Sequence, residues 1–185
     1  MTIEFIITLF GLVFFAAFWK FTDPREKRMF EDLKNSRIRV MTFFEIMSAI
    51  FAYIIYFVFP QYSLNLSSNI VNIGLLIFVG GISFAVWAKV VMGKNWNHPV
   101  EHIIERQTEI VKSGPFKYSR NPIYVGLFIC FVGFFISLSS PLIIFALLLA
   151  LIIKKIVAKE EINLEKLFGE KYMEYKKQVP RYLLF

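Results

Sequence analysis

Five runs of apolar residues alternate with polar segments along the chain. They cover residues 3–19, 40–59, 70–92, 122–138 and 142–157. At 1.5 Å per residue, the first run would form a helix of about 25 Å, close to the thickness of a bilayer's hydrocarbon core. The pattern predicts an all-α integral membrane bundle of about five transmembrane helices.

The spacing of these runs indicates one membrane domain over residues 1–185, because no internal repeat or low-complexity linker divides the chain. Residues 1–92 contain the first three expected spans, and residues 93–185 contain the last two with most of the polar chemistry. The turn at residues 139–141 is short, so we expect the last two helices to form an antiparallel hairpin.

The segment after the fifth run is charged and amphipathic. Its apolar side chains recur at helical spacing and are Leu164, Leu167, Phe168, Tyr172 and Tyr175. Such a stripe predicts an amphipathic helix that packs or lies on the membrane surface. Gly169 is a candidate end for one helix and beginning for the next.

The composition supports the membrane interpretation. Hydrophobic residues make up 57% of the chain, against roughly 45–50% in soluble domains. The net charge of +7 would favour nucleic acid only on a soluble fold with a basic face. Here the charges lie between apolar runs, so we expect membrane lipids and no nucleic acid as partners.

The basic residues predict the topology. All 21 lysines and arginines fall in three segments, with seven in 20–39, six in 89–120 and eight in 154–181. The positive-inside rule places these segments in the cytoplasm, with the amino terminus outside and the carboxyl terminus inside. We expect residues 20–39 to form a loop with a short helix at the membrane surface.

No metal site is predicted. The only histidines, His98 and His102, are four residues apart, but Pro99 interrupts the segment and an HExxH motif is missing. The single Cys130 excludes an intramolecular disulfide and lies in an apolar run, which indicates a packing role.

Glu45 lies inside the second apolar run. An ionisable group within a span is a functional candidate. It lies only about 8 Å of helix from the end of the run, however, where a carboxylate can pair with a basic residue of the loop. Both interpretations stay open.

A helix beginning is predicted at Asn121-Pro122, since asparagine caps free N–H groups and proline suits the first helical position. Arg120 and Tyr124 flank this point four residues apart and can reach the same side. Arg120 is a candidate functional residue or an arginine that extends to lipid headgroups. Glu160 and Glu161 follow the fifth run, and adjacent helical residues point about 100° apart. We therefore expect one carboxylate to face a site and the other to be solvated.

Four motifs in residues 93–185 resemble the isoprenylcysteine carboxyl methyltransferase family and the related membrane phospholipid methyltransferases. They are Ser113-Gly114-Pro115-Phe116, the Arg-Asn-Pro-Ile-Tyr-Val-Gly run of residues 120–126, Glu160-Glu161 with Leu164, and the aromatic tail of residues 168–180. Asn95-Trp96-Asn97-His98 is similar to the family's entry to the same loop. The first half of the chain matches only in hydropathy.

The resemblance implies methyl transfer from S-adenosylmethionine, bound at the cytoplasmic face, to a lipophilic acceptor from the bilayer. The foremost acceptor is the carboxylate of an isoprenylcysteine-like substrate, held by Arg120. Arg120 and Glu161 are the implied catalytic residues. The implied cofactor-binding residues are His98, Asn121, Pro122, Tyr124, Gly126, Glu160, Glu161 and Tyr172.

Two departures leave the acceptor open, since Asn121 and Thr108 stand where relatives often have histidine. Asparagine cannot titrate, and a carboxylate acceptor needs no base, whereas an amine or thiol must lose a proton. Asn121 thus argues mildly against a base at this position. A phospholipid or thiol methyltransferase of the same fold stays open as one alternative. An NADPH-dependent membrane reductase of the sterol-reductase type is another, and a non-enzymatic membrane protein is the third.

Overall fold

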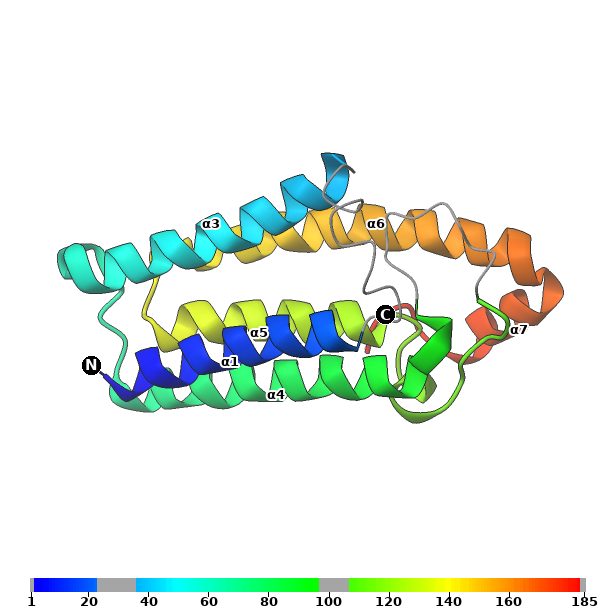
Figure 1. The fold of residues 1–185 in the computed structure, drawn as a ribbon, viewed down its shortest axis with the longest axis horizontal. Helices are drawn as coiled ribbons and strands as arrows, with labels where there is room; N and C mark the ends of the chain where they lie inside the picture. The colour runs from blue at the N-terminus through cyan, green and yellow to red at the C-terminus, as the bar shows by residue number, and fades with distance from the viewer. Residues whose placement is uncertain (1, 23–35, 97–106, 184–185) are drawn as a thin grey trace.

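The computed structural model describes residues 2–22, 36–96 and 107–183, and every regular element in these ranges is helical (Figure 1). The long helices are α1 (Ile3–Phe21), α3 (Ser36–Val58), α4 (Ser68–Met92), α5 (Pro122–Ser137), α6 (Phe145–Phe168) and α7 (Glu170–Gln178). Short 3-10 turns are η1 (Pro60–Tyr62), η2 (Gly93–Asn95), η4 (Gly114–Lys117) and η5 (Pro141–Ile144). The expected all-α class is confirmed.

The first four helices match the expected apolar runs to within a few residues, and α6 differs. We expected the fifth span to end at residue 157, but α6 continues through the charged sequence to Phe168. No proline or glycine interrupts residues 145–168, so nothing in the backbone stops the helix earlier. Gly169, at a φ of 55°, ends α6 and precedes α7, as its sequence position predicted.

Helices α4 and α5 form the tightest pair in the described chain, and glycines at their interface set the separation. A Cβ atom at Gly126 would lie 2.6 Å from the backbone nitrogen of Ala85, and one at Gly81 or Gly133 would clash with backbone atoms of the partner helix. The paired positions run in opposite directions along the two helices, which are therefore antiparallel. This packing fixes the start of α5, where the Arg-Asn-Pro motif lies.

Helices α1 and α3 complete the apolar end of the bundle. The Tyr53 hydroxyl on α3 donates to Thr8 Oγ1 on α1 at 3.0 Å, and the Tyr53 ring meets Phe134 of α5 edge-on. Phe134 belongs to a buried aromatic core, which also contains Cys130. The packing role predicted for Cys130 is confirmed.

Helices α5 and α6 run antiparallel, as the short turn between them predicted (Figure 1). Ser139 adopts a φ of 47°, and the Ser140 hydroxyl accepts from the Leu142 N–H, which together close this turn. α6 therefore returns toward the beginning of α5 and carries Glu160 and Glu161 to the level of Arg120.

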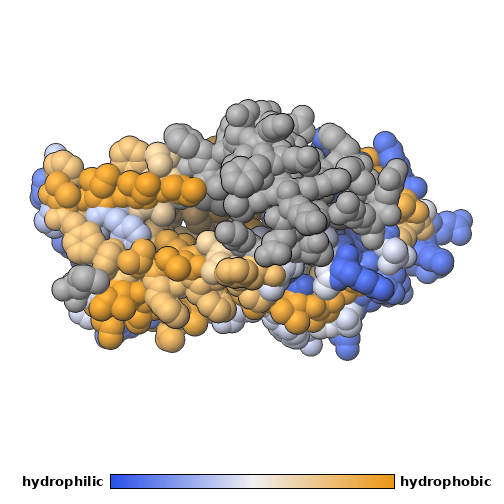
Figure 2. Space-filling view, in the orientation of Figure 1, coloured by the Kyte–Doolittle hydropathy of each residue, from blue (hydrophilic) through white to orange (hydrophobic). Residues whose placement is uncertain are grey.

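Two helical stretches, Ser68–Asn95 and Pro141–Phe168, are long and apolar enough to cross a membrane. Three shorter apolar stretches are Ile3–Trp19, Ile46–Val58 and Pro122–Ser137. Figure 2 shows apolar side chains over the half of the molecule away from α7 and hydrophilic side chains at the α7 end. Many large apolar side chains lie on the surface, as expected for helices that face lipid. Phe10, Leu76 and Leu147 are each more than two-thirds exposed.

Candidate functional site

The motif of residues 120–126 and the Glu160-Glu161 motif meet at an ion pair between Arg120 and Glu161. Arg120 precedes α5, and Glu161 lies on α6, where its side chain is only 2% exposed. The Arg120 Nη2 and Nε atoms donate to Glu161 Oε1 at 2.9 and 3.1 Å. The segment before α5 and the end of α6 therefore meet in space.

Arg181, beyond the end of α7, binds the other oxygen of the same carboxylate. Its Nη2 and Nε atoms donate to Glu161 Oε2 at 2.6 and 3.1 Å, and these bonds raise the pKa of the Arg181 guanidinium. Each carboxylate oxygen of Glu161 therefore accepts from one guanidinium. Such charge-assisted pairs fix geometry as well as adding energy.

The remaining contacts of Arg120 are with the tail of the chain. Its Nη1 atom donates to the carbonyl of Val179 at 2.6 Å and to that of Lys176 at 3.1 Å. Its backbone N–H donates to the Pro180 carbonyl at 3.0 Å. All three guanidinium nitrogens are engaged, and the side chain is 8% exposed. Arg120 thus ties α5, α6 and the tail together and does not extend to lipid headgroups, which corrects that alternative.

Asn121 begins α5, but its side chain does not cap the helix. Its Nδ2 atom donates instead to Glu161 Oε1 at 3.3 Å and to the Arg181 carbonyl at 3.2 Å. The predicted capping bond is therefore wrong, because the amide is drawn to the buried carboxylate. Pro122 occupies the first position of α5, as predicted.

Glu160 faces α5 and is half-buried. The Tyr124 hydroxyl donates to Glu160 Oε1 at 2.8 Å. The expectation that one of the two carboxylates is solvated is therefore wrong, since Glu160 and Glu161 both contact the region where α5 begins. Their directions differ by about 100°, so Glu161 meets Arg120 and Asn121 just before α5, whereas Glu160 meets Tyr124 in the first turn of α5.

Tyr172 and Tyr175 of α7 are 2% and 3% exposed and pack with Val179. The Tyr175 hydroxyl donates to the Phe116 carbonyl in η4 at 2.6 Å, which joins the tail to the Ser-Gly turn. Burial raises the pKa of both tyrosines, so each hydroxyl keeps its proton. A cofactor contact of Tyr172 stays a prediction.

Gly126 packs against α4 through the close approach to Ala85. This contact accounts for the glycine by helix packing, and its place in a cofactor site stays a prediction. His98 lies among residues 97–106, outside the described residues, as does His102. The side chain of Glu45 is likewise not described, although its backbone lies in α3.

Metal ligands do not cluster within residues 2–22, 36–96 and 107–183. The expected loop and short helix of residues 20–39 fall largely on residues 23–35, which are outside the described part of the chain.

Sequence reasoning missed Arg181 and Tyr182. Arg181 was counted only as one of the basic residues that set the topology. Its position directly after the Val179-Pro180 motif was the available signal, because a residue beside a recognised motif shares its surroundings. No local pattern singled out Tyr182, whose ring packs against the cluster of Tyr124 and Val157.

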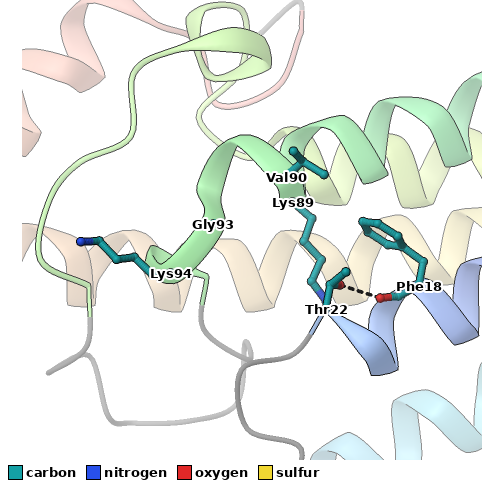
Figure 3. A pocket seen from close by; sticks show the side chains of 6 residues that line it. All are labelled: Phe18, Thr22, Lys89, Val90, Gly93 and Lys94. Carbon is teal, nitrogen blue, oxygen red and sulfur yellow. Dashed lines mark hydrogen bonds between the residues drawn. The ribbon is translucent and has the colours of Figure 1, made fainter.

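A second polar feature lies where α1 and α4 end (Figure 3). Lys89 is 3% exposed, and its Nζ atom donates to the Trp19 carbonyl at 3.0 Å. The ammonium lies 4.2 Å from the ring centre of Trp19 and 4.1 Å from that of Trp96. A shallow pocket beside it is lined by Phe18, Thr22, Lys89, Val90, Gly93 and Lys94. Lys89 thereby fastens the end of α1 to α4.

Long apolar helices that carry a buried arginine–glutamate cluster at one end make this chain a helical membrane protein with a polar site. The sequence model of the phospholipid methyltransferase family matches residues 70–171, which is more than half of the chain and includes Arg120 and Glu161. The chain belongs to this family.

Relatives with known names are protein-S-isoprenylcysteine O-methyltransferases. The Homo sapiens and Mus musculus proteins are 36% and 35% identical over 114 residues, covering 60% of this chain and 40% of each relative. Protein-S-isoprenylcysteine O-methyltransferase B of Arabidopsis thaliana is 29% identical over 111 residues, covering 59% of this chain and 56% of the relative. The chain therefore spans about two fifths of the length of the mammalian relatives.

A solved structure of the eukaryotic intramembrane Ras methyltransferase ICMT, an isoprenylcysteine carboxyl methyltransferase, has a similar fold. The TM-score is 0.67 and the sequence identity 29%, over 80% of this chain and 53% of that protein. The likeness extends beyond the motif region, because 80% of this chain includes helices from its first half.

Proposed function

We propose that this chain is an integral membrane methyltransferase that uses S-adenosylmethionine and modifies the carboxylate of an isoprenylcysteine-like acceptor. One observation carries the proposal. The cluster of Arg120, Asn121 and Glu161 joins the two motif stretches of a phospholipid methyltransferase family member into one buried polar site. The names of the relatives support the choice of acceptor.

We propose five membrane spans, with the amino terminus outside and the site at the cytoplasmic face. The two long and three shorter apolar stretches support this number. Arg120, Lys176 and Arg181 lie near the same end of the bundle as Glu161, which fits the positive-inside rule. Residues 1–92 then form the first three spans of a single domain, and residues 93–185 the motif region.

The residues present fit the methyl donor chemically. Among the described residues, Glu160 accepts a hydrogen bond from Tyr124 through its Oε1 atom. Its other carboxylate oxygen suits an ammonium or a ribose hydroxyl of the donor. The backbone N–H groups in the first turn of α5 suit a carboxylate. The rings of Tyr124 and Tyr172 suit a neighbouring sulfonium, and His98 remains a proposed contact.

When bound, S-adenosylmethionine supplies a methyl group whose carbon–sulfur bond breaks as the acceptor oxygen bonds to that carbon. A carboxylate oxygen already has the electron pair it needs, so the protein has no proton to remove, consistent with asparagine at position 121. Most of the work of the protein is then positioning. Arg120 and Glu161 hold α5, α6 and the tail in register, which makes them positioning residues in this proposal.

A phospholipid amine is the second candidate acceptor, favoured by the description of the matching family. An amine must lose a proton before or during methyl transfer, which requires a base. The two acceptors also give different products, since a methyl ester releases methanol in alkali and an N-methyl group does not.

The experiment is methyl transfer by the purified protein in lipid nanodiscs. Methyl-labelled S-adenosylmethionine is supplied with N-acetyl-S-farnesylcysteine, with phosphatidylethanolamine or with a long-chain alkyl thiol. We expect label in an alkali-labile product of the farnesylcysteine alone. Glu161→Gln should abolish transfer, whereas Lys177→Gln, a charge change on the exposed side of α7, should leave it intact. A folded wild-type protein that neither binds S-adenosylhomocysteine nor transfers label would refute the proposal.

A further inference from the structure

The Tyr182 hydroxyl oxygen is buried and makes no hydrogen bond within the part of the chain that the structure describes. Among the described residues, its oxygen is the one buried side-chain nitrogen or oxygen that makes no hydrogen bond. Buried polar groups in folded proteins are nearly always paired, because an unpaired donor loses its bonds to water without replacement. An unpaired buried hydroxyl beside a candidate site indicates a group that can form a hydrogen bond with a bound ligand.

The surroundings of Tyr182 suit a lipophilic ligand. Its ring packs against a cluster formed by Tyr124 of α5 and by Leu149, Ile153 and Val157 of α6. The three α6 residues lie four apart, on the helix face that carries Glu161 one turn further on. An apolar wall from the two helices therefore leads to the charged cluster.

Arg181, the residue before Tyr182, supplies a positive charge, and part of its side chain is exposed. Two of its nitrogens bind Glu161, yet the side chain remains 34% exposed, compared with 8% for Arg120. Arg120, Arg181 and the single carboxylate of Glu161 together carry one net positive charge. Glu160 lies outside this cluster and has its own bond with Tyr124.

We infer that the Tyr182 hydroxyl and the exposed side of the Arg181 guanidinium bind the carboxylate of the lipophilic acceptor. The inference rests on the proposed function and names the acceptor contact within that site. It replaces Arg120, whose guanidinium nitrogens are all engaged within the protein, as the residue that recognises the acceptor.

A carboxylate matches this pair of donors. It has two oxygens, one for a neutral hydroxyl and one for a guanidinium, and its negative charge balances the net charge of the cluster. Burial raises the pKa of the Tyr182 hydroxyl, so the group keeps its proton and acts as a donor. The methyl donor also carries a carboxylate, but the apolar wall of α5 and α6 favours the acceptor, whose other end is a hydrocarbon chain.

The test compares Tyr182→Phe with Tyr118→Phe, a matched control whose side chain is 60% exposed. The wild-type and variant proteins are assayed in nanodiscs for thermal unfolding, for binding of S-adenosylhomocysteine and for transfer to N-acetyl-S-farnesylcysteine. Tyr182→Phe removes a hydroxyl without a partner, so unfolding and S-adenosylhomocysteine binding should not change. The KM for the acceptor should rise about tenfold to a hundredfold, as expected for one lost hydrogen bond to a charged group. The control should match the wild type.

Arg181→Gln and Arg181→Lys extend the test, with Lys177→Gln as the charge-matched control. Arg181→Gln should raise the KM by at least about tenfold and remove the preference for binding the free acid over its methyl ester. Arg181→Lys keeps the positive charge, so it should recover part of the acceptor affinity and part of the preference for the free acid. This comparison remains informative even if Arg181→Gln does not fold.

The outcomes separate the inference from the proposed function. A wild-type protein inactive toward every acceptor refutes the proposed function, and this inference falls with it. An active wild type whose acceptor KM is unchanged by Tyr182→Phe and by Arg181→Lys overturns the inference alone. Weaker binding of S-adenosylhomocysteine at an unchanged acceptor KM would assign the carboxylate to the methyl donor and would also overturn it.

Discussion

The guanidinium of Arg120 lies 2.9 Å from the carboxylate of Glu161, a residue 41 positions further along the chain. The whole hairpin of α5 and α6 separates them in sequence. Because Glu161 also binds Arg181 and Asn121, one buried carboxylate contacts the beginning of α5, α6 and the tail at the same time.

Replacement of Glu161 by glutamine should destabilise the protein strongly. Two guanidinium groups would lose their shared counter-charge, and one of them is buried, so we expect a loss of about 3 kcal/mol. The free energy of unfolding in detergent measures the effect. Glu165→Gln is the control, because its ion pair with Lys176 is about one-third exposed and contributes less than about 1 kcal/mol. Equal losses in both variants would contradict a special role for Glu161.

Replacement of Gly81 by alanine should loosen the α4–α5 pair. The added methyl group would clash with the backbone of Cys130, and separation of the helices should cost about 1–3 kcal/mol. Gly80→Ala provides the matched control one residue away. Nothing lies within 4 Å of its added Cβ, so this change should be neutral or stabilise α4 by up to about 1 kcal/mol. Thermal unfolding of the two variants distinguishes them, and the same shift in both would refute the packing argument.

Lys89→Gln should weaken the junction of α1 with α4. The amide cannot replace a desolvated ammonium between two tryptophan rings, and we expect a loss of about 2 kcal/mol. Lys94→Gln, at an exposed position of the neighbouring turn, should change stability by less than about 0.5 kcal/mol. Tryptophan fluorescence during unfolding, measured in a Trp87→Phe background, reports on the environment of Trp19 and Trp96. An unchanged midpoint in Lys89→Gln would show that the aromatic contacts contribute little.

Tyr175→Phe should detach the tail from η4 in part. Its hydroxyl is buried and donates to the Phe116 carbonyl, so its removal should cost about 1–2 kcal/mol and leave that carbonyl unpaired. Hydrogen exchange of α7 amides should accelerate in this variant. Tyr118→Phe, an exposed tyrosine of the same segment, should leave the exchange rates unchanged. Protection of α7 that survives Tyr175→Phe would argue that apolar packing alone holds the tail.

The sequence by itself determined the helical class, the position of the long helices and the neighbourhood of the site. Hydrophobic runs set where helices form, and Pro122 and Gly169 set where α5 begins and α6 ends, because both residues act through local backbone geometry. The short turn at residues 139–141 required α6 to return beside α5, which placed Glu161 near Arg120.

Only the tertiary structure decided how the polar side chains are shared. Asn121 binds Glu161 and does not cap α5, and Glu160 binds Tyr124 where a solvated carboxylate was expected. Arg181, which the sequence did not single out, binds Glu161. The hydrogen-bond partner of a side chain can come from any segment packed around it. The periodic pattern of one segment carries no information about which other segments those are. The arrangement of α5, α6 and the tail around one buried carboxylate therefore became visible only when the three segments were placed together.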